Sequence, residues 1–273
     1  MMAPIGIFDS GYGGLTILEK IRAHLPQYDY IYLGDNARAP YGTRSYEVVY
    51  HYTRQCVEHL FEMGCRLVIL ACNTASAKAL RTIQQRDLPQ LAPDRRVLGV
   101  IRPTVEAVGQ VSVTRHVGIL ATPGTVLSAS YPIEISKLHA DIKVSQQACP
   151  MWVPLIENDE HQSQGADYFV EKYTQMLLRQ DADIDSIVLA CTHYPLLLEK
   201  IAKVVPPHIR LITQGQIVAE RLADYLMRHP EIDQCCQRGG RCQYYTTEST
   251  DKFSRSARIF LQEDIVAEHV ELV

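Results

Sequence analysis

Two stretches of the sequence constrain the fold more than any others, because each is an apolar run that ends in Ala-Cys and then turns polar. Residues 67–74 have the sequence LVILACNT, and residues 187–195 have the sequence IVLACTHYP. Such aliphatic runs are typical of buried parallel strands. Cys72 and Cys191 then lie at carboxyl ends of strands, where open α/β sheets bind ligands. One such cysteine could be a packing residue, but two, each followed by hydroxyl and amide groups, indicate a functional pair.

Predicted strands and helices alternate along the whole chain, which is the pattern of parallel α/β sheets. The order of strand, polar turn, helix, cysteine strand and helix occurs twice, starting near residue 5 and again near residue 116. We therefore predict an α/β fold of two pseudo-symmetric domains, with mainly parallel sheets flanked by helices and both cysteines at one cleft between them. Residues 126–138 are expected as one helix, and residues 88–95 and 153–159 as loops.

The composition narrows the class of protein. The chain has 273 residues, 47% of them hydrophobic, which is enough for one or two domains. Its formal net charge is -4 and its Lys and Arg residues form no basic block, so nucleic acid is not an expected partner. No apolar run approaches the roughly 20 residues of a membrane span, and the N-terminus lacks the pattern of a signal peptide. We expect a cytoplasmic protein whose eight cysteines are thiols.

Several kinds of cysteine chemistry fit parts of the sequence. A hydrolase needs one thiolate with a histidine beside it, and a dithiol redox site usually has Cys-x-x-Cys spacing, which neither strand shows. A zinc site needs clustered ligands, and the only such cluster in the sequence is Cys235, Cys236 and Cys242, with His229 upstream. A polar surface segment explains that cluster at least as well, so no metal is predicted.

Racemisation fits two equivalent cysteines best. The reaction takes a proton from one face of a carbon acid and returns a proton to the other, so it needs an acid and a base on opposite sides of the substrate. Cysteine suits both roles because its unperturbed pKa of about 8.5 lies near working pH. Asp9, at the end of the first predicted strand, and His193, just beyond Cys191, are the candidates for moving protons to and from the thiols.

The predicted strand-to-helix turns also supply neutral groups that could hold a substrate. Such turns at helix N-termini bind carboxylates well. Arg38 is the only cationic residue in them, and the sequence contains no complete phosphate-loop or dinucleotide motif. The expected ligand is therefore a small polar acid rather than a phosphorylated molecule. The groups are the side chains of Ser10, Asn73, Thr74, Thr122 and Thr192 and the backbone N–H groups of Gly11, Gly42, Thr74 and His193.

Four segments together resemble the signature sequences of the glutamate racemase family, within the aspartate/glutamate racemase superfamily. They are residues 9–16 (DSGYGGLT), 40–42 (PYG), 71–75 (ACNTA) and 191–195 (CTHYP), and the similarity covers nearly the whole chain. The resemblance implies an isomerase that needs no cofactor and has its active site between two α/β domains. The first domain would be discontinuous, with residues 1–98 plus 207–273, and the second would contain residues 99–206.

The resemblance also implies a role for individual residues. Cys72 would be the base for the D-enantiomer and Cys191 for the L-enantiomer. Asp9 and His193 would assist their respective thiols, with Glu157 as a weaker third candidate. The predicted substrate contacts are Asp9, Ser10, Pro40, Tyr41, Gly42, Cys72, Asn73, Thr74, Thr122, Cys191, Thr192 and His193. The D-glutamate product would supply peptidoglycan synthesis, which implies a bacterial source, and the resemblance leaves a homodimer open.

The sequence departs from the family pattern at two places. Gln214 precedes Gly215 where the family often has an acidic residue, and residues 229–242 look like a local insertion. Neither departure is expected to touch the catalytic positions. The alternatives to a glutamate racemase are an aspartate racemase, a non-catalytic binding protein on the same scaffold, and a cysteine-dependent hydrolase. Exchange of the α-proton of glutamate in heavy water, with aspartate as control, would separate these alternatives.

Overall fold

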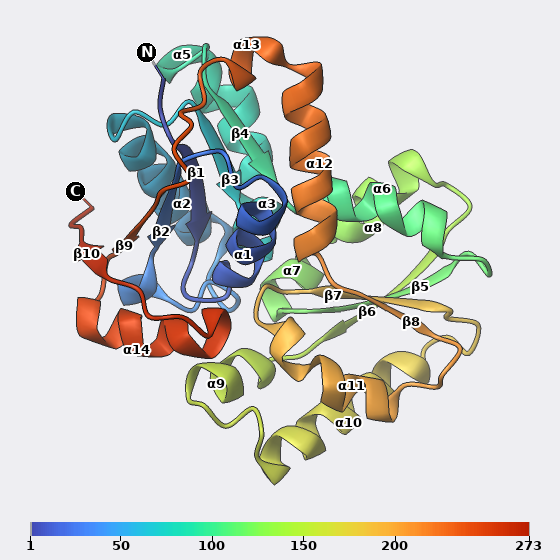
Figure 1. Ribbon diagram of the computed structural model, residues 1–273. Coiled ribbons are helices and arrows are strands. Elements are labelled where there is room, and N and C mark those ends of the chain that lie inside the picture. The colour runs from blue at the N-terminus through green and yellow to red at the C-terminus, as the bar shows by residue number, and fades with distance from the viewer. Residues whose placement is uncertain (1, 273) are drawn as a thin grey trace.

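The computed structural model describes residues 2–272, which form two parallel β-sheets flanked by helices (Figure 1). This confirms the predicted α/β class. We call the six-stranded sheet with its helices the first lobe, and the four-stranded sheet with its helices the second lobe. In the first sheet the strand order is β10 (Ala267–His269), β9 (Cys242–Thr246), β2 (Tyr30–Gly34), β1 (Ile5–Asp9), β3 (Leu67–Leu70) and β4 (Arg96–Gly99). In the second sheet the order is β6 (Lys143–Ala148), β5 (His116–Ala121), β7 (Ser186–Ala190) and β8 (Arg210–Ile212).

Helices cover both sheets, and α12 and α6 lie where the two lobes meet (Figure 1). The helices of the first lobe are α1 (Leu15–His24), α2 (Tyr46–Glu62), α3 (Asn73–Lys78), α4 (Leu80–Thr82), α5 (Leu88–Leu91), α12 (Gly215–Arg228), α13 (Pro230–Asp233) and α14 (Thr250–Leu261). Those of the second lobe are α6 (Ile101–Val111), α7 (Pro123–Leu127), α8 (Ser130–Leu138), α9 (Trp152–Glu157), α10 (Gln164–Leu178) and α11 (Leu198–Val204). Short 3-10 helices occur at Asn36–Arg38 and Tyr194–Leu197, and a π-helical turn at Ile83–Asp87.

Strand register determines where the polar turns lie. Phe8 of β1 pairs with Leu70 of β3, so the segments that follow these two strands leave the first sheet as neighbours. Ala121 of β5 pairs with Ala190 of β7 in the same way in the second sheet. Because all of these pairs are parallel, the turns after them share the carboxyl edge of their sheet. The strand ends with the Ala-Cys motif therefore lie at the edges that the sequence predicted.

The two lobes share apolar packing at their junction. The strands β1, β3 and β7 are buried along their whole length, which explains why their sequences are apolar at nearly every position. Trp152 of the second lobe is fully buried, and its ring packs edge-on against Tyr194 with centroids 4.7 Å apart. Both rings belong to one buried cluster that also contains Ile7 and Leu18 of the first lobe. Part of the junction between the lobes is therefore a packed apolar core.

The predicted helix over residues 126–138 is wrong in one respect, because the structure has two helices there. Thr122 caps α7, since its Oγ1 accepts a hydrogen bond from the Thr125 N–H at 3.3 Å. Helix α7 therefore starts earlier than predicted. Ala129 has a positive φ of 51°, which separates α7 from α8. A left-handed residue cannot continue a right-handed helix, so the chain changes direction at this point.

Both of the predicted loops contain helices. Helix α5 lies within residues 88–95, and α9 covers most of residues 153–159. Pro89 and Pro154 favoured loops in the sequence, but each lies in the first turn of its helix. The first N–H groups of a helix have no intrahelical partner, so a proline there loses no hydrogen bond. These prolines therefore lie at the start of a helix and do not interrupt one.

One part of the predicted domain division disagrees with the strand pairing. Residues 207–273 were expected in the first domain, but β8 pairs with β7 in the second sheet. A short apolar segment adds readily to the open edge beside β7, so the second sheet continues at least to Ile212. Helix α12, which follows, packs against α1 of the first lobe. The predicted boundary near residue 98 stays a prediction.

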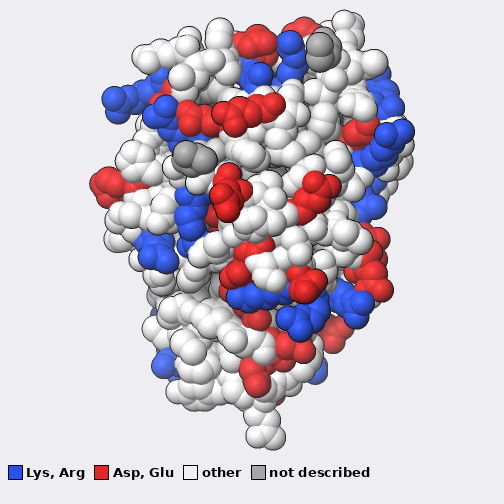
Figure 2. All heavy atoms as spheres, turned by 90° about the vertical axis from the view of Figure 1, so that its left-hand side faces the viewer, with Lys and Arg blue, Asp and Glu red and all other residues white. Residues whose placement is uncertain are grey.

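The surface shown in Figure 2 has Lys and Arg side chains interspersed with Asp and Glu, and no continuous basic area on that face. This distribution is in keeping with the net charge of -4. No helix among residues 2–272 combines the length and the apolar character that crossing a membrane requires. All eight cysteines of the chain are free.

Candidate active site

A cavity of about 80 Å³ lies where the carboxyl edges of the two sheets meet. Its wall contains residues that directly follow strands of both lobes, so neither lobe could form it alone. Cys72, after β3, and Cys191, after β7, both line it. The other predicted site residues that line it are Ser10, Pro40, Tyr41, Gly42, Asn73, Thr74, Thr122, Glu157, Thr192 and His193. Asp9 and Gly11 are the predicted site residues that do not line the cavity.

Cys72 is the N-cap residue of α3, and its thiol is almost completely buried. The Sγ accepts a hydrogen bond from the Ala75 N–H at 3.4 Å and lies 3.3 Å from the Ser10 Oγ. Burial, and then the nearby carboxyl of Asp9, raise the pKa of Cys72 to about 12. The thiol form therefore dominates at neutral pH in the free protein, and a base on this side has to be generated during reaction.

Cys191 has a different set of neighbours. Its Sγ lies 3.8 Å from Nδ1 of His193, and the other ring nitrogen of His193 lies 3.0 Å from Oε1 of Glu157. Burial alone would lower the pKa of His193, but the hydrogen bonds and charges of Cys191 and Glu157 outweigh it and raise the pKa to about 10. The imidazole therefore holds a proton at neutral pH. The series Glu157, His193, Cys191 can relay a proton to or from the cavity.

Asp9 is fully buried, outside the cavity wall. Its Oδ2 accepts a hydrogen bond from the Gly11 N–H at 3.0 Å, whereas Oδ1 has no hydrogen-bond partner among the described residues. Burial raises the pKa of Asp9 to about 6, against the opposing charge of His193. The carboxyl can therefore gain or lose a proton near neutral pH. Its position favours a role through Cys72 rather than direct contact with a ligand.

Hydrogen bonds of hydroxyl and backbone groups join the two lobes around the cavity. Thr74 Oγ1, from the first lobe, lies 2.9 Å from Thr122 Oγ1 of the second. The Gly124 N–H donates to the carbonyl oxygen of Gly42 at 2.7 Å. The Thr16 hydroxyl donates to the carbonyl oxygen of Thr192 at 2.9 Å on the other side. These contacts hold the turns of one lobe in a fixed position against the turns of the other.

Two polar side chains of these turns, the predicted substrate contact Tyr41 and the cationic Arg38, are occupied by the protein itself. The Tyr41 hydroxyl donates to the Asp35 carboxylate. Arg38 binds the same carboxylate through Nε, with distances of 2.9 and 2.7 Å, and does not line the cavity. The cavity wall of the described chain therefore contains no Lys or Arg, and its polar groups are mainly neutral. This agrees with the expectation of a small acid held by neutral donors.

The sequence analysis missed several cavity residues, of which Cys149 is the most informative. Cys149 follows Ala148, the last residue of β6, just as Cys191 follows Ala190, the last residue of β7. Its buried thiol lines the same cavity. The same Ala-Cys signal was present, but β6 contains Lys143, Gln146 and Gln147 and so lacks the apolar run that marked the other strands. The remaining missed residues are Ala39, Thr43, Pro123, Pro150, Val153 and Pro154.

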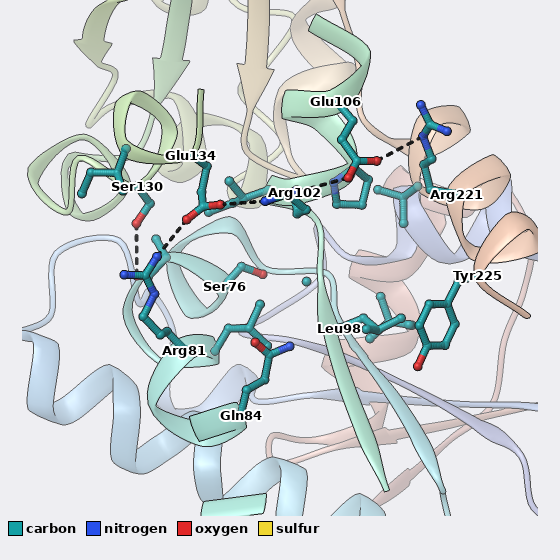
Figure 3. A pocket seen from close by; sticks show the side chains of 18 of the residues that line it. Ser76, Arg81, Gln84, Leu98, Arg102, Glu106, Ser130, Glu134, Arg221 and Tyr225 are labelled. Atoms are coloured by element: carbon teal, nitrogen blue, oxygen red, sulfur yellow. Dashed lines mark hydrogen bonds and ion pairs between the residues drawn. The ribbon is translucent and has the colours of Figure 1, made fainter. Parts of the chain in front are cut away.

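A larger cavity of about 620 Å³ lies on another part of the lobe junction (Figure 3). None of the predicted site residues lines it, and it contains no thiol. A chain of ion pairs runs along it: Arg81 and Arg102 bind Glu134 at 2.8 and 3.5 Å, and Arg102 and Arg221 bind Glu106 at 3.1 and 3.6 Å (Figure 3). The carboxylates of this cavity, Glu106 and Glu134, are held in ion pairs with Arg side chains. The smaller cavity instead has thiols from both lobes, so the smaller one is the candidate active site.

Paired α/β lobes that bring thiols of both to one shared cavity fit an isomerase, and the comparison with known proteins agrees. Residues 15–222 match the model of the Asp/Glu/Hydantoin racemase family, and the chain belongs to that family. It is 39% identical over 274 residues to a glutamate racemase of Ruegeria sp. (strain TM1040), with 97% of this chain and 98% of the relative covered. The protein is therefore a racemase by family and closely related to glutamate racemases.

Solved structures support the same assignment. The chain is similar to a glutamate racemase isoform from Bacillus anthracis, with a TM-score of 0.90, 31% identity and coverage of 99% of this chain and 98% of the other. It is also similar to the glutamate racemase from Francisella tularensis in complex with D-glutamate, with a TM-score of 0.87, 31% identity and the same coverage. Both lobes take part in these matches, because they cover nearly the whole chain.

Proposed function

We propose that the protein interconverts L- and D-glutamate by a two-base mechanism in which Cys72 and Cys191 act on opposite faces of the α-carbon. The observation that carries this proposal is that the two thiols come from equivalent strand ends of the two sheets and line one cavity. A racemase needs an acid and a base on either side of the substrate. Two related lobes facing each other supply such a pair.

In one direction Cys191 removes the α-proton of L-glutamate and Cys72 delivers a proton to the other face, and the roles reverse for D-glutamate. His193, held by Glu157 at 3.0 Å, exchanges protons with Cys191. Asp9 and Ser10 serve Cys72, where the Ser10 hydroxyl lies 3.3 Å from the sulfur. No cofactor is required in this scheme, because the two thiols provide both acid and base. Dialysis against a chelator should leave the rate unchanged.

The choice of glutamate rests on the relatives, which are named glutamate racemases, and on the D-glutamate bound in the Francisella tularensis structure. Neutral donors at helix N-termini, such as those of α3 and α7, can bind the carboxylates of a small acid. The D-glutamate formed would be used for peptidoglycan synthesis in the cytoplasm of a bacterium. Measurement of the molecular mass in solution would decide whether the protein forms a homodimer.

The decisive test is α-proton exchange in heavy water, measured by NMR on L- and D-glutamate separately. We expect both enantiomers to exchange and interconvert, and aspartate to react far more slowly. Exchange of aspartate at the rate of glutamate would make the protein an amino-acid racemase of broader specificity. Absence of exchange with either acid, in protein shown to be folded, would favour a binding protein on the same scaffold.

A further inference from the structure

Gln214, between β8 and α12, belongs to a buried polar cluster that reaches the residue next to Cys72. The Asn73 Nδ2 donates to Gln214 Oε1 at 2.6 Å, and Gln214 Nε2 lies 3.2 Å from Asn73 Oδ1. Asn73 and Gln214 are only 3% and 2% exposed. The two amide side chains are therefore paired through the Asn73 Nδ2–Gln214 Oε1 hydrogen bond and shielded from water. Position 214 does not line the candidate active site, but it contacts Asn73, a predicted substrate contact that does.

Two hydroxyl groups fix which way the Gln214 amide points. The Thr104 hydroxyl donates to the Val100 carbonyl at 2.7 Å, so toward Gln214 it can only accept, and Nε2 lies 2.9 Å away. The Tyr131 hydroxyl donates to Asn73 Oδ1 at 2.8 Å and likewise accepts from Gln214 Nε2 at 2.9 Å. The proton of each hydroxyl is thus already used. This arrangement requires a donor at position 214, which an amide provides and a carboxylate does not.

The cluster connects the active site to both lobes. Asn73 begins α3 in the first lobe, Tyr131 belongs to α8 in the second, and Thr104 belongs to α6 at the junction. Gln214 contacts all three side chains. Its Oε1 accepts a hydrogen bond from one of the two N–H groups of the Asn73 amide. The second N–H is then left to donate to a ligand in the cavity. Small displacements of a catalytic turn lower the rate strongly, so a residue that fixes this turn affects the chemistry.

We propose that Gln214 is a positioning residue for the Cys72 side of the active site, holding the Asn73 amide and the turn that carries Cys72 in register with the second lobe. This inference rests on the proposed function, since it assigns the effect of Gln214 to one of the two bases. A residue that only stabilised the fold would affect both bases alike. A positioning residue for Cys72 should affect reactions that begin at Cys72 more than those that begin at Cys191.

The test uses Gln214→Glu, which keeps the shape of the side chain but replaces the amide nitrogen, a hydrogen-bond donor, with a carboxylate oxygen, an acceptor. Loss of hydrogen bonds in a buried cluster should lower kcat/KM for D-glutamate racemisation by about tenfold or more. With glutamate analogues that carry a β leaving group, elimination from the D-analogue should fall more than elimination from the L-analogue. In parallel, peptide mapping after brief iodoacetamide treatment should show faster labelling of Cys72, because its turn is less firmly held, and unchanged labelling of Cys191.

Gln216→Glu is the matched control, because it makes the same change two residues along, at an exposed side chain of α12. Among the described residues this side chain bonds Glu220, from which the new carboxylate can turn away into solvent. It should behave like the wild type. If Gln214→Glu does not fold, Tyr131→Phe removes one hydroxyl of the cluster and should give a smaller effect in the same direction. Equal losses for both analogues, or unchanged Cys72 labelling in Gln214→Glu, would overturn the proposal. Wild-type protein that fails to racemise glutamate would instead overturn the proposed function, while the labelling result still decides whether Gln214 positions Cys72.

Discussion

At Cys72 and Cys191 the same side chain meets two different proton partners. Cys72 lies beside a hydroxyl and close to a buried carboxyl whose pKa is raised to about 6. Cys191 lies beside an imidazole whose pKa is raised to about 10 by its hydrogen bonds, in spite of burial. The two strand ends are thus similar in backbone, but the groups that exchange protons with the thiol differ between the two lobes. We therefore expect substitutions on the two sides to change kcat and KM of the two directions unequally, while kcat/KM falls by the same factor for L- and D-glutamate because the enantiomers have equal free energy.

The first prediction concerns the thiols themselves. Cys72→Ser and Cys191→Ser should each lower racemisation by at least about a thousandfold, because a hydroxyl is a poor base at neutral pH and every turnover needs both faces. One-face elimination should survive in part. Cys72→Ser should retain it with the L-analogue bearing a β leaving group, and Cys191→Ser with the D-analogue. If both variants process both analogues alike, the assignment of faces is wrong even though the cysteines are essential.

The second prediction concerns Asp9 and pH. Burial raises the pKa of Asp9 from 3.8 to about 6, so the folded protein holds this proton more tightly than the unfolded chain does. The resulting stabilisation is complete below the unfolded value and is lost as pH rises through about 6. The difference corresponds to about 3 kcal/mol. Urea unfolding of wild type and Asp9→Asn should therefore differ increasingly in favour of the variant from about pH 4 to pH 7. A difference that is constant over this range would contradict the buried-carboxyl argument.

At the scale of elements, the turn after β1 is packed directly against the segment after β7. A side-chain Cβ at Gly13 would lie 2.3 Å from both His193 Nδ1 and Thr192 Oγ1, which is closer than real atoms approach. The Thr16 hydroxyl, in the first turn of α1, donates to the Thr192 carbonyl oxygen at 2.9 Å. The start of α1 therefore determines where His193 lies, although the two belong to different lobes.

The third prediction follows from this packing. Gly13→Ala should destabilise the protein by about 1–3 kcal/mol, because neither neighbour is the end of a long flexible side chain. It should also lower kcat/KM by more than about tenfold by moving His193 away from Cys191. Gly165→Ala is the control, since its added methyl group would meet only Ser163 Oγ at 3.4 Å, an ordinary contact. Thermal unfolding and glutamate racemisation measure both effects. Wild-type activity in Gly13→Ala would show that the lobes adjust freely at this contact.

The elements that the sequence predicted are those with a local signal. The strands before Cys72 and Cys191 are apolar runs, and both strand ends reach the candidate site as expected. Strand β6 lacks such a run, so Cys149 was missed, and α9 was missed because Pro154 favours a loop as well as a helix start. No local pattern could reveal the contact between Asn73 and Gln214, because it joins residues 141 positions apart. Long-range hydrogen bonds depend on how the lobes pack, which the sequence pattern does not encode.

At the scale of the whole molecule, the ion pairs beside the larger cavity connect the lobes on a second side (Figure 3). Glu134 of α8 is 19% exposed at its side chain and binds Arg81 of α4, from the first lobe, at 2.8 Å. It also binds Lys137 at 2.6 Å and Arg102 at 3.5 Å. These partners are about half exposed, so each pair contributes little and only the group as a whole has a measurable effect.

The fourth prediction tests that contribution. Glu134→Gln should lower the free energy of unfolding by about 0.5–1 kcal/mol at low salt. The loss should shrink at about 1 M NaCl, where the Debye length falls to about 3 Å. Glu19→Gln is the control, because among residues 2–272 Glu19 pairs only with its neighbour Lys20, on the surface of one lobe. Thermal unfolding at the two salt concentrations is the measurement. An equal loss at both would mean that Glu134 acts through packing instead of charge.

The path of the chain has a consequence for its synthesis. The chain leaves the first sheet after β4 and returns to it only at β9, with the whole second sheet in between. During synthesis, every strand of the second lobe is therefore made before β9, the strand that pairs with β2. Domains generally fold as units in the order in which they emerge. The nascent chain therefore passes through a stage in which the second sheet is complete while the first sheet still lacks β9 and β10. The open edge of β2 at that stage is where chaperones, or a second nascent chain, would attach.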